Sequence, residues 1–499
     1  MKYINKILLF AIAVFIGHSC SDLEEDTSSL LEIGKIENEG DIAANVAPIY
    51  RNLLEMYKNP HRVRITTFGS DDITTWDAGN KAPLRVFDKF DYGNGENSDN
   101  SWLPYVWDGY WKTIYYCNTL IHGLKTSTAA EELVKVADAE ARTFRALSYL
   151  NLVKMYGNVP FILDGVIPTG KEQRATVLEN YQQIESDLLI AEKYLPLPGT
   201  EETGRASASL AKAILADLYL TWAGWPVKDA SKNQLAANKA KEVIDYNYHS
   251  LVPINELWTL SGAESTETIF SLRFSLDQSI VSQQATAFTF HQGRGFSDCF
   301  PELQFFNDFP AGPRKDATFV LDIPNRGITN GVIEDKSPAT KPWQTSDRKH
   351  PMYKKYVLAE DLVFGKRPAS FRSIEAYRYA EILLIYAEGQ ARGNGENASS
   401  IEALNEVRRR AYPSGTPDVT TATPAQIVDE KGWELAAENK RWFDLVRTER
   451  LAEMASKRDP LEAVTLSIVP TEAQYIAPIP FNTISLSKLK QNPEGFKIQ

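Results

Sequence analysis

The sequence has few cysteines and few histidines, and this scarcity excludes several kinds of site. Three cysteines among 499 residues cannot supply the disulfide framework of a small secreted domain. The six histidines form no HExxH motif and no CxxC motif is present, so the sequence predicts no metal site and no cofactor. A P-loop and a GxSxG elbow are also missing. The paired carboxylates of a glycosidase leave no such motif, so a hydrolase stays open as an alternative.

Basic residues are the minority among the charged ones. The chain has 54 Lys and Arg against 65 Asp and Glu, which gives a formal net charge of −11. This balance argues against nucleic acid and anionic membrane surfaces as partners and is compatible with a neutral ligand. Aromatic residues make up 11% of the chain, and a surplus of them on loops is what a sugar-binding protein needs.

The apolar run at the N-terminus is too short to cross a bilayer as a helix. It covers residues 7–16, follows two lysines and leads through small residues to Cys20. This order predicts a lipoprotein signal peptide over residues 1–19, with diacylglycerol on the Cys20 thiol after cleavage. An ordinary secreted protein with a chance cysteine is the alternative. Residues 20–40, which begin with four acids in residues 21–26, are predicted to be a lipidated acidic tether.

Apolar residues at three- and four-residue steps predict helices in both the N-terminal and the C-terminal parts of the remaining chain. The predicted helices cover residues 41–58, 102–123, 130–156, 174–195, 206–222, 233–246, 375–392, 399–411 and 423–451. Thr423 and Gln426 form a capping box at the start of the last one. Paired helices with short links are compatible with tetratricopeptide-like repeats.

Residues 250–370 are rich in Gly, Pro, Asp and Asn, which predicts loops with short strands, one of them over residues 268–272. We therefore predict a single domain over residues 41–499. Its helical repeats would occupy about residues 41–250 and 375–451, and a loop-rich ligand-binding insert would occupy about residues 250–370.

Acidic and basic residues alternate near the C-terminus. The pattern consists of Glu430, Glu434, Glu438, Arg441, Asp444 and Arg447. Steps of three and four residues place such groups on one helix face, and we interpret them as an ion-pair network between helices, with a polar binding face as the alternative. Cys117 lies in an apolar helical pattern that predicts a buried free thiol, and a pairing with Cys299 stays open.

Several segments together resemble the SusD/RagB family of outer-membrane lipoproteins. They are residues 139–160, which end in Gly157-Asn158-Val159-Pro160, and residues 204–220, 377–388, 404–408, 434–447, 477–480 and 491–493. The chain departs from the family pattern at Lys431, where arginine is usual, and at Asn439, where glycine is usual. The resemblance covers essentially the whole chain after the signal peptide.

The resemblance implies a mainly α-helical, SusD-like fold in which four tetratricopeptide-like helix pairs pack on an irregular, loop-rich half with short strands. It implies a non-enzymatic lipoprotein of the Bacteroidota, anchored in the outer membrane by its lipid and facing the cell exterior. Such a protein captures oligosaccharides and delivers them to a SusC-like TonB-dependent transporter. The alternatives are a surface glycoside hydrolase and a peptide-capturing member of the same family.

Candidate ligand-binding residues are aromatic residues that lie on loops, because rings stack against the C–H faces of sugars. These candidates are Trp76, Trp102, Phe296 and Trp343. Asp72 and Arg294 are predicted to bond sugar hydroxyls. For each tryptophan the alternative is packing within its own loop, and Trp107, Trp111 and Trp442 are assigned to the core.

Overall fold

The computed structural model describes most of the chain. The described residues are 35–59, 65–91, 102–275, 281–290, 295–324, 328–329, 332–333, 340–357, 371–487 and 489–492. The chain divides into two units, Met1–Lys35 and Ile36–Gln499, and the helices and strands named below all belong to the second unit. The predicted signal peptide, the lipidation site Cys20 and the predicted hydroxyl ligand Arg294 lie outside the described residues. Within those residues, no helix combines the length and apolar character needed to cross a membrane.

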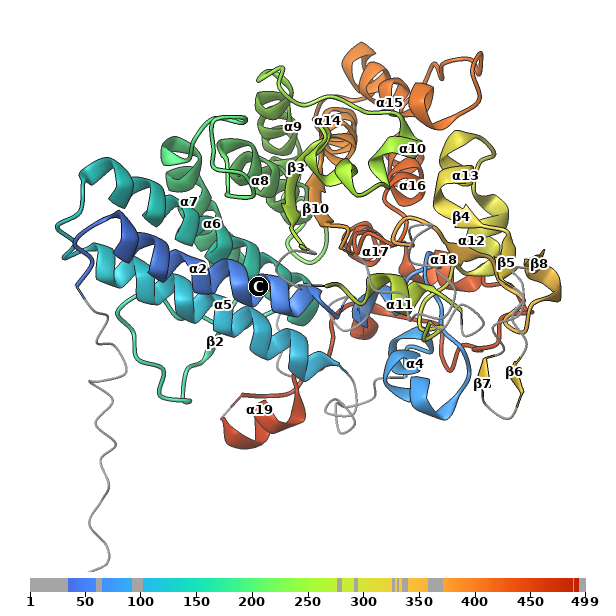
Figure 1. The fold of residues 1–499 in the computed structure, drawn as a ribbon, viewed down its shortest axis with the longest axis horizontal. Coiled ribbons are helices and arrows are strands. Elements are labelled where there is room, and N and C mark those ends of the chain that lie inside the picture. The colour runs from blue at the N-terminus through green and yellow to red at the C-terminus, as the bar shows by residue number, and fades with distance from the viewer. Residues whose placement is uncertain are drawn as a thin grey trace, which may run out of the picture. The chain divides into compact units, whose positions relative to one another are not determined.

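Four pairs of helices form one half of the unit (Figure 1). The pairs are α2 (Glu39–Tyr57) with α5 (Leu103–Leu124), α6 (Glu131–Tyr156) with α7 (Val177–Tyr194), α8 (Ala208–Trp222) with α9 (Lys232–Ile244), and α14 (Tyr379–Asn394) with α15 (Ala398–Ala411). Successive pairs pack through α5 on α6, α7 on α8 and α9 on α14. The predicted mainly helical, tetratricopeptide-like arrangement is confirmed.

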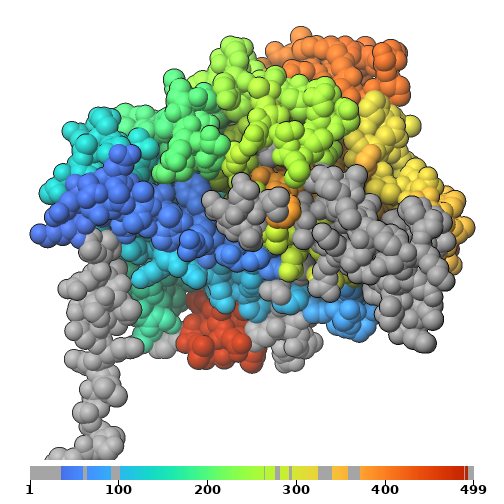
Figure 2. All heavy atoms as spheres, viewed as in Figure 1, coloured from blue at the N-terminus to red at the C-terminus, as the bar shows by residue number. Residues whose placement is uncertain are grey.

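Small residues permit the close contact between α9 and α14. At Gly389 of α14, an added Cβ atom would lie 2.8 Å from the carbonyl oxygen of Asn233 and from the amide nitrogen of Ala237. Any larger residue at this position would push the two helices apart. This contact joins parts of the chain that are far apart in sequence. A second contact of this kind lies between the segments around residues 250 and 410, which are neighbours in Figure 2. There Arg410 donates a hydrogen bond to the carbonyl oxygen of Val252.

The other half consists of short elements and loops, as predicted for residues 250–370. Its helices are α4 (Ala82–Asp88), α10 (Ile254–Leu257), α11 (Gln284–Phe288), α12 (Leu303–Asp308) and α13 (Pro313–Thr318). Its strands form antiparallel two-stranded ladders: β4 (Phe319–Val320) with β9 (Met352–Tyr353), β5 (Asp322–Pro324) with β8 (Thr340–Pro342), and β6 (Ile328–Thr329) with β7 (Val332–Ile333). A further ladder joins β1 (Val159–Pro160) to β2 (Arg174–Ala175).

The predicted strand over residues 268–272 is confirmed as β3 (Thr268–Leu272), but its partner corrects a helix prediction. Residues Ile374–Arg378 form β10, which pairs with β3, and helix α14 begins only at Tyr379. Four of the five β10 residues are buried, so pairing and burial override the helical pattern read from residue 375.

The predicted long helix over residues 423–451 is also wrong in its length. The capping box at Thr423 is present, but the segment forms α16 (Pro424–Glu434), α17 (Arg441–Arg447) and α18 (Leu451–Ser456), followed later by α19 (Phe481–Leu486). Ala437 and Asn439 between α16 and α17 have φ values of 63°, in the left-handed region. Asparagine tolerates this region better than most residues, so Asn439 adopts it with little strain.

Candidate ligand-binding site

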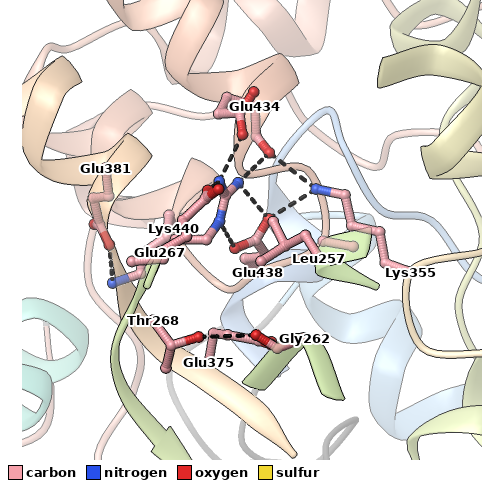
Figure 3. A network of polar contacts seen from close by, with 12 residues as sticks. Leu257, Gly262, Glu267, Thr268, Lys355, Glu375, Glu381, Glu434, Glu438 and Lys440 are labelled. Atoms are coloured by element: carbon pink, nitrogen blue, oxygen red, sulfur yellow. Dashed lines mark hydrogen bonds and ion pairs between the residues drawn. The ribbon is translucent and has the colours of Figure 1, made fainter. Parts of the chain in front are cut away.

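A buried ionic network lies where β10 meets the segment between α16 and α17 (Figure 3). Arg378 of β10 bonds a carboxylate oxygen of Glu267 at 2.9 Å, of Glu434 at 2.6 Å and of Glu438 at 2.8 Å, and it also donates to the Glu434 carbonyl oxygen. These bonds and a second one to Glu438 use all five N–H groups of the guanidinium.

Paired charges surround this centre. Burial raises the pKa of the Glu438 carboxyl, but Arg378 and Lys355 outweigh burial and hold the pKa below its ordinary value. The cationic groups of Lys355 and Arg378 lie 4.6 and 5.6 Å from the ring centre of buried Trp258. No polar group of Arg378 is left for a ligand, so this network is structural.

The ion-pair interpretation of the C-terminal charge pattern is confirmed, although most partners come from other elements. Glu430 pairs with Arg314 at 2.7 Å, Arg441 with Asp71 at 2.7 Å, and Arg447 with Glu388 at 2.6 Å. Within the pattern itself, Asp444 pairs with Arg447 at 2.7 Å, and it also pairs with Lys431 at 3.1 Å. The charges therefore bind helices and loops together rather than form a binding face.

Three loops of the other half converge and bring several predicted residues together. Thr74 and Phe300 form an antiparallel bridge, with N–H to O distances of 2.9 and 3.2 Å. The ring of Phe300 in turn lies 4.6 Å from that of His350. These contacts join residues 74–81, 296–300 and 343–350. Four residues on these loops are together called the loop face: Trp76, Phe296, Trp343 and Arg348.

Trp76 is half-buried, and the guanidinium carbon of Arg348 lies 4.5 Å from its ring centre. Trp343 is also half-buried and packs edge-on against Phe306, with 5.6 Å between ring centres. The Ser346 hydroxyl donates to the Trp343 carbonyl oxygen at 2.7 Å and closes the turn between Trp343 and Arg348. The loop face therefore presents two partly exposed indoles, one of them under a cation.

Arg348 was not predicted from the sequence, and it lacks the close carboxylate partners that Arg378 has. Asp347 approaches it only to 3.6 Å, and in the described part of the chain its Nε atom has no hydrogen-bond partner. Burial lowers its pKa from the ordinary value. The sequence signal was weak, because Arg348 lies in a polar stretch with other charges and only its contact with Trp76 sets it apart.

Phe296 joins the loop face through its backbone. Its carbonyl oxygen accepts a hydrogen bond from Lys81 Nζ at 2.7 Å, and Lys81 also forms a short ion pair with Asp298. Lys81 ends a short 3-10 helix over Gly79–Lys81, directly after the Trp76 loop. The side chain of Phe296 is half-buried, as expected of a residue at the edge of a binding surface.

The structure contradicts the predicted role of Asp72. Its side chain has no exposed surface, and its carboxylate accepts hydrogen bonds from the Ser70 hydroxyl at 2.5 Å and the Ala437 amide at 2.8 Å. Burial, the largest effect, raises its pKa to about 6. Asp72 fixes the Trp76 loop to the turn at Ala437 and does not reach a ligand, because sequence alone does not distinguish a buried loop carboxylate from an exposed one.

Trp102 lies just before α5, whose first turns are fixed by the helical half. Tyr105 donates to the Glu55 carbonyl oxygen at 2.7 Å, and Tyr156 donates to the Leu103 carbonyl oxygen at 3.2 Å. These contacts do not link Trp102 to the loop face, so its role in binding stays a separate prediction. Trp107 and Trp442 are buried as predicted, and Trp111 is half-buried against Tyr149.

The two cysteines of the described residues lie in the interior. Cys117 and Cys299 are both buried and are not bonded to each other, which confirms the predicted free thiol of Cys117, and burial raises the pKa of Cys117. Among the described residues, no group of His, Cys, Asp and Glu is arranged to bind a metal ion. Two hollows, of about 700 Å³ beside Trp258 and about 450 Å³ beside Arg205, contain none of the predicted site residues.

Two family models and several known proteins are similar to this chain. Residues 312–494 match the family model described as the SusD family, and residues 41–220 match the model described as starch-binding associating with outer membrane. SusD-like protein P2 of Formosa agariphila is 24% identical over 479 residues, which cover 90% of this chain and 91% of that protein. The chain belongs to the SusD/RagB family.

Solved structures show the same fold. A SusD superfamily protein from Parabacteroides distasonis superposes with a TM-score of 0.76 at 24% identity, covering 91% of this chain and 99% of that chain. Surface glycan-binding protein A from Bacteroides thetaiotaomicron, in complex with laminarihexaose, superposes with a TM-score of 0.74 at 19% identity, covering 91% and 99%.

Proposed function

We propose that this protein is a cell-surface glycan-binding lipoprotein that captures oligosaccharides at the loop face. The observation that carries the proposal is the half-buried indole of Trp76 under Arg348, with a second half-buried indole, Trp343, on the loop that carries Arg348. A sugar ring offers C–H groups on its faces and hydroxyls on its rim. An indole stacks on the face, and the N–H groups of a partly exposed arginine donate to the rim.

The similar proteins support this ligand class. One is described as a surface glycan-binding protein with bound laminarihexaose, and another structure of the same fold carries a xylogluco-oligosaccharide. Phe296 extends the proposed surface, and Trp102 is a further candidate from the helical half. Asp72 is left out because it is buried.

Delivery is the second part of the proposal. The captured oligosaccharide passes to a SusC-like TonB-dependent transporter, and the protein stays at the exterior of the outer membrane through lipid on Cys20. The family model that names outer-membrane association supports this location. The single domain over residues 41–499 acts by binding and catalyses no reaction.

A panel of plant and host glycans tests the proposal with the purified protein. We expect binding of at least one oligosaccharide without any change in its chain length after prolonged incubation. Release of shorter products would overturn the proposal in favour of a glycoside hydrolase. Binding of peptides in a parallel pull-down, with no glycan bound, would identify a peptide-capturing protein instead. Mild detergent extraction from the native membrane should co-purify a TonB-dependent barrel, and its absence would overturn the delivery role.

A further inference from the structure

Beneath the loop face, His350 has two hydrogen-bond partners that both accept. Its Nδ1 atom lies 2.6 Å from the carbonyl oxygen of Arg348, and its Nε2 atom lies 2.9 Å from Oε2 of Glu462. A carbonyl oxygen cannot donate, so Nδ1 carries a hydrogen. A second hydrogen must then lie between Nε2 and the Glu462 carboxylate.

The pair therefore holds one proton more than a neutral imidazole beside an ionised carboxylate. Whether that proton resides on the ring or on Glu462, its loss leaves two lone pairs facing each other in a buried site. His350 and Glu462 are 2% and 6% exposed. Glu462 cannot turn away freely, because its Oε1 atom accepts the Leu303 amide hydrogen at 2.6 Å.

Two further buried carboxyl groups lie near this pair. Glu302 and Asp88 are buried nearby, and both bond Arg458, at 3.2 and 2.6 Å. Burial raises the pKa of Glu302 well above its ordinary value, and the neighbouring Glu462 and Asp88 raise it further. Three carboxyl groups thus lie close to one arginine and one histidine in a buried part of the protein.

The pair is connected to the loop face by a short path. Arg348 offers His350 its carbonyl oxygen and places its guanidinium over Trp76. The His350 ring packs on Phe300, whose backbone pairs with Thr74, two residues before Trp76. We propose that His350 and Glu462 form a proton-dependent latch that positions the Arg348–Trp76 stack, and that the 343–350 loop loosens when the pair loses its proton.

The importance of the latch for glycan capture rests on the proposed function, but the latch itself is testable without a glycan. Hydrogen exchange of the peptide covering residues 343–353 is measured at about pH 6 and about pH 9 and corrected for the intrinsic pH dependence of exchange. We expect the wild-type peptide to lose about fivefold in protection at the higher pH, whereas α8, buried in the helical half, serves as an internal reference and keeps its protection.

Glu462→Gln is the discriminating variant. The glutamine oxygen can accept the Leu303 amide hydrogen, and its NH₂ group can donate to Nε2 of a neutral His350, so all hydrogen bonds are satisfied without the extra proton. We expect this variant to keep the 343–353 peptide protected at both pH values. Equal pH sensitivity in wild type and variant, or none in wild type, would overturn the latch. If Glu462→Gln does not fold, His350→Gln, which keeps a non-titrating donor toward Glu462, provides the same comparison.

This result is independent of the ligand question. A pH-sensitive wild-type loop in a protein that binds no glycan would support the latch and refute the proposed function. A loop whose protection does not change with pH, in a protein that binds a glycan, would refute the latch and support the proposed function.

Discussion

Arg378, which lies over buried Trp258, and Arg348, which lies over half-buried Trp76, have opposite surroundings. Arg378, over buried Trp258, directs every N–H group at Glu267, Glu434 or Glu438. Arg348, over half-buried Trp76, has a distant carboxylate at 3.6 Å and an Nε atom without a partner in the described structure. Arg378 is enclosed by its partners and stabilises the fold, whereas the side chain of Arg348 is partly exposed beside a partly exposed indole.

The largest expected effect on stability comes from removing Arg378 from its carboxylate partners. Arg378→Met would leave three buried carboxylates short of a partner, and we expect a loss of about 3–5 kcal/mol in the free energy of unfolding. The matched control is Arg409→Met, because Arg409 pairs with Glu402 and Asp418 at the surface and should contribute at most about 1 kcal/mol. Thermal and urea unfolding measure both, and similar losses in the two variants would refute the contrast.

Trp76→Ala and Trp343→Ala test whether the loop face binds a glycan. We expect at least one of the tryptophan variants, including Trp102→Ala, to weaken binding of the strongest oligosaccharide from the panel about tenfold, or about 1.4 kcal/mol. The melting temperature should change little, since these side chains are only half-buried. Trp258→Ala is the contrasting variant and should lower the melting temperature strongly. Isothermal titration that finds unchanged affinity in all three loop variants would place the site elsewhere.

Asp72 fixes the Trp76 loop to the turn at Ala437. Replacing it should give the smallest effect on stability, seen as a change in how stability depends on pH. Its pKa is raised to about 6 in the folded protein by burial, so protonation favours the folded state. The associated stability is complete below the unfolded pKa of about 4 and is lost as pH rises through about 6.

Asp72→Asn removes this titration while keeping a bond to the Ala437 amide and one to the Ser70 oxygen. We expect the stability of Asp72→Asn relative to wild type to rise by about 1 kcal/mol between about pH 5 and about pH 8. Urea unfolding at the two pH values checks the sign, and a difference that is constant or falls with pH would contradict it.

Periodicity was sufficient to predict the helical frame but not the polar site. The apolar steps of α6 and the capping box at Thr423 are local signals, and the structure retains both. The break after Glu434 depends on left-handed residues at Ala437 and Asn439, and strand β10 depends on its pairing with β3, about 100 residues earlier. Neither has a local signature, so the helical pattern alone predicts a helix at both places.

The same limit applied to the site. Trp76 and Trp343 were proposed because aromatic residues on polar loops stand out, and both are half-buried, whereas Asp72 was assigned to the site on the same kind of evidence and is buried. Arg348, His350 and Glu462 acquire their significance only from contacts, the last of them across 112 positions in sequence. Such contacts follow from the tertiary fold, which a single sequence does not supply.

The close contact between α9 and α14 at Gly389 has a consequence for how the sequence of this protein can change in evolution. This contact brings together the two ends of the segment between α9 and α14, so the loop-rich insert begins and ends at a well-packed junction. In a flexible loop, even a doubling of length raises the entropic cost of closure by only about 0.6 kcal/mol, far below the expected loss from Arg378→Met. Length changes in surface loops of this insert, away from Glu267, Arg314 and Lys355, therefore cost the helical frame little.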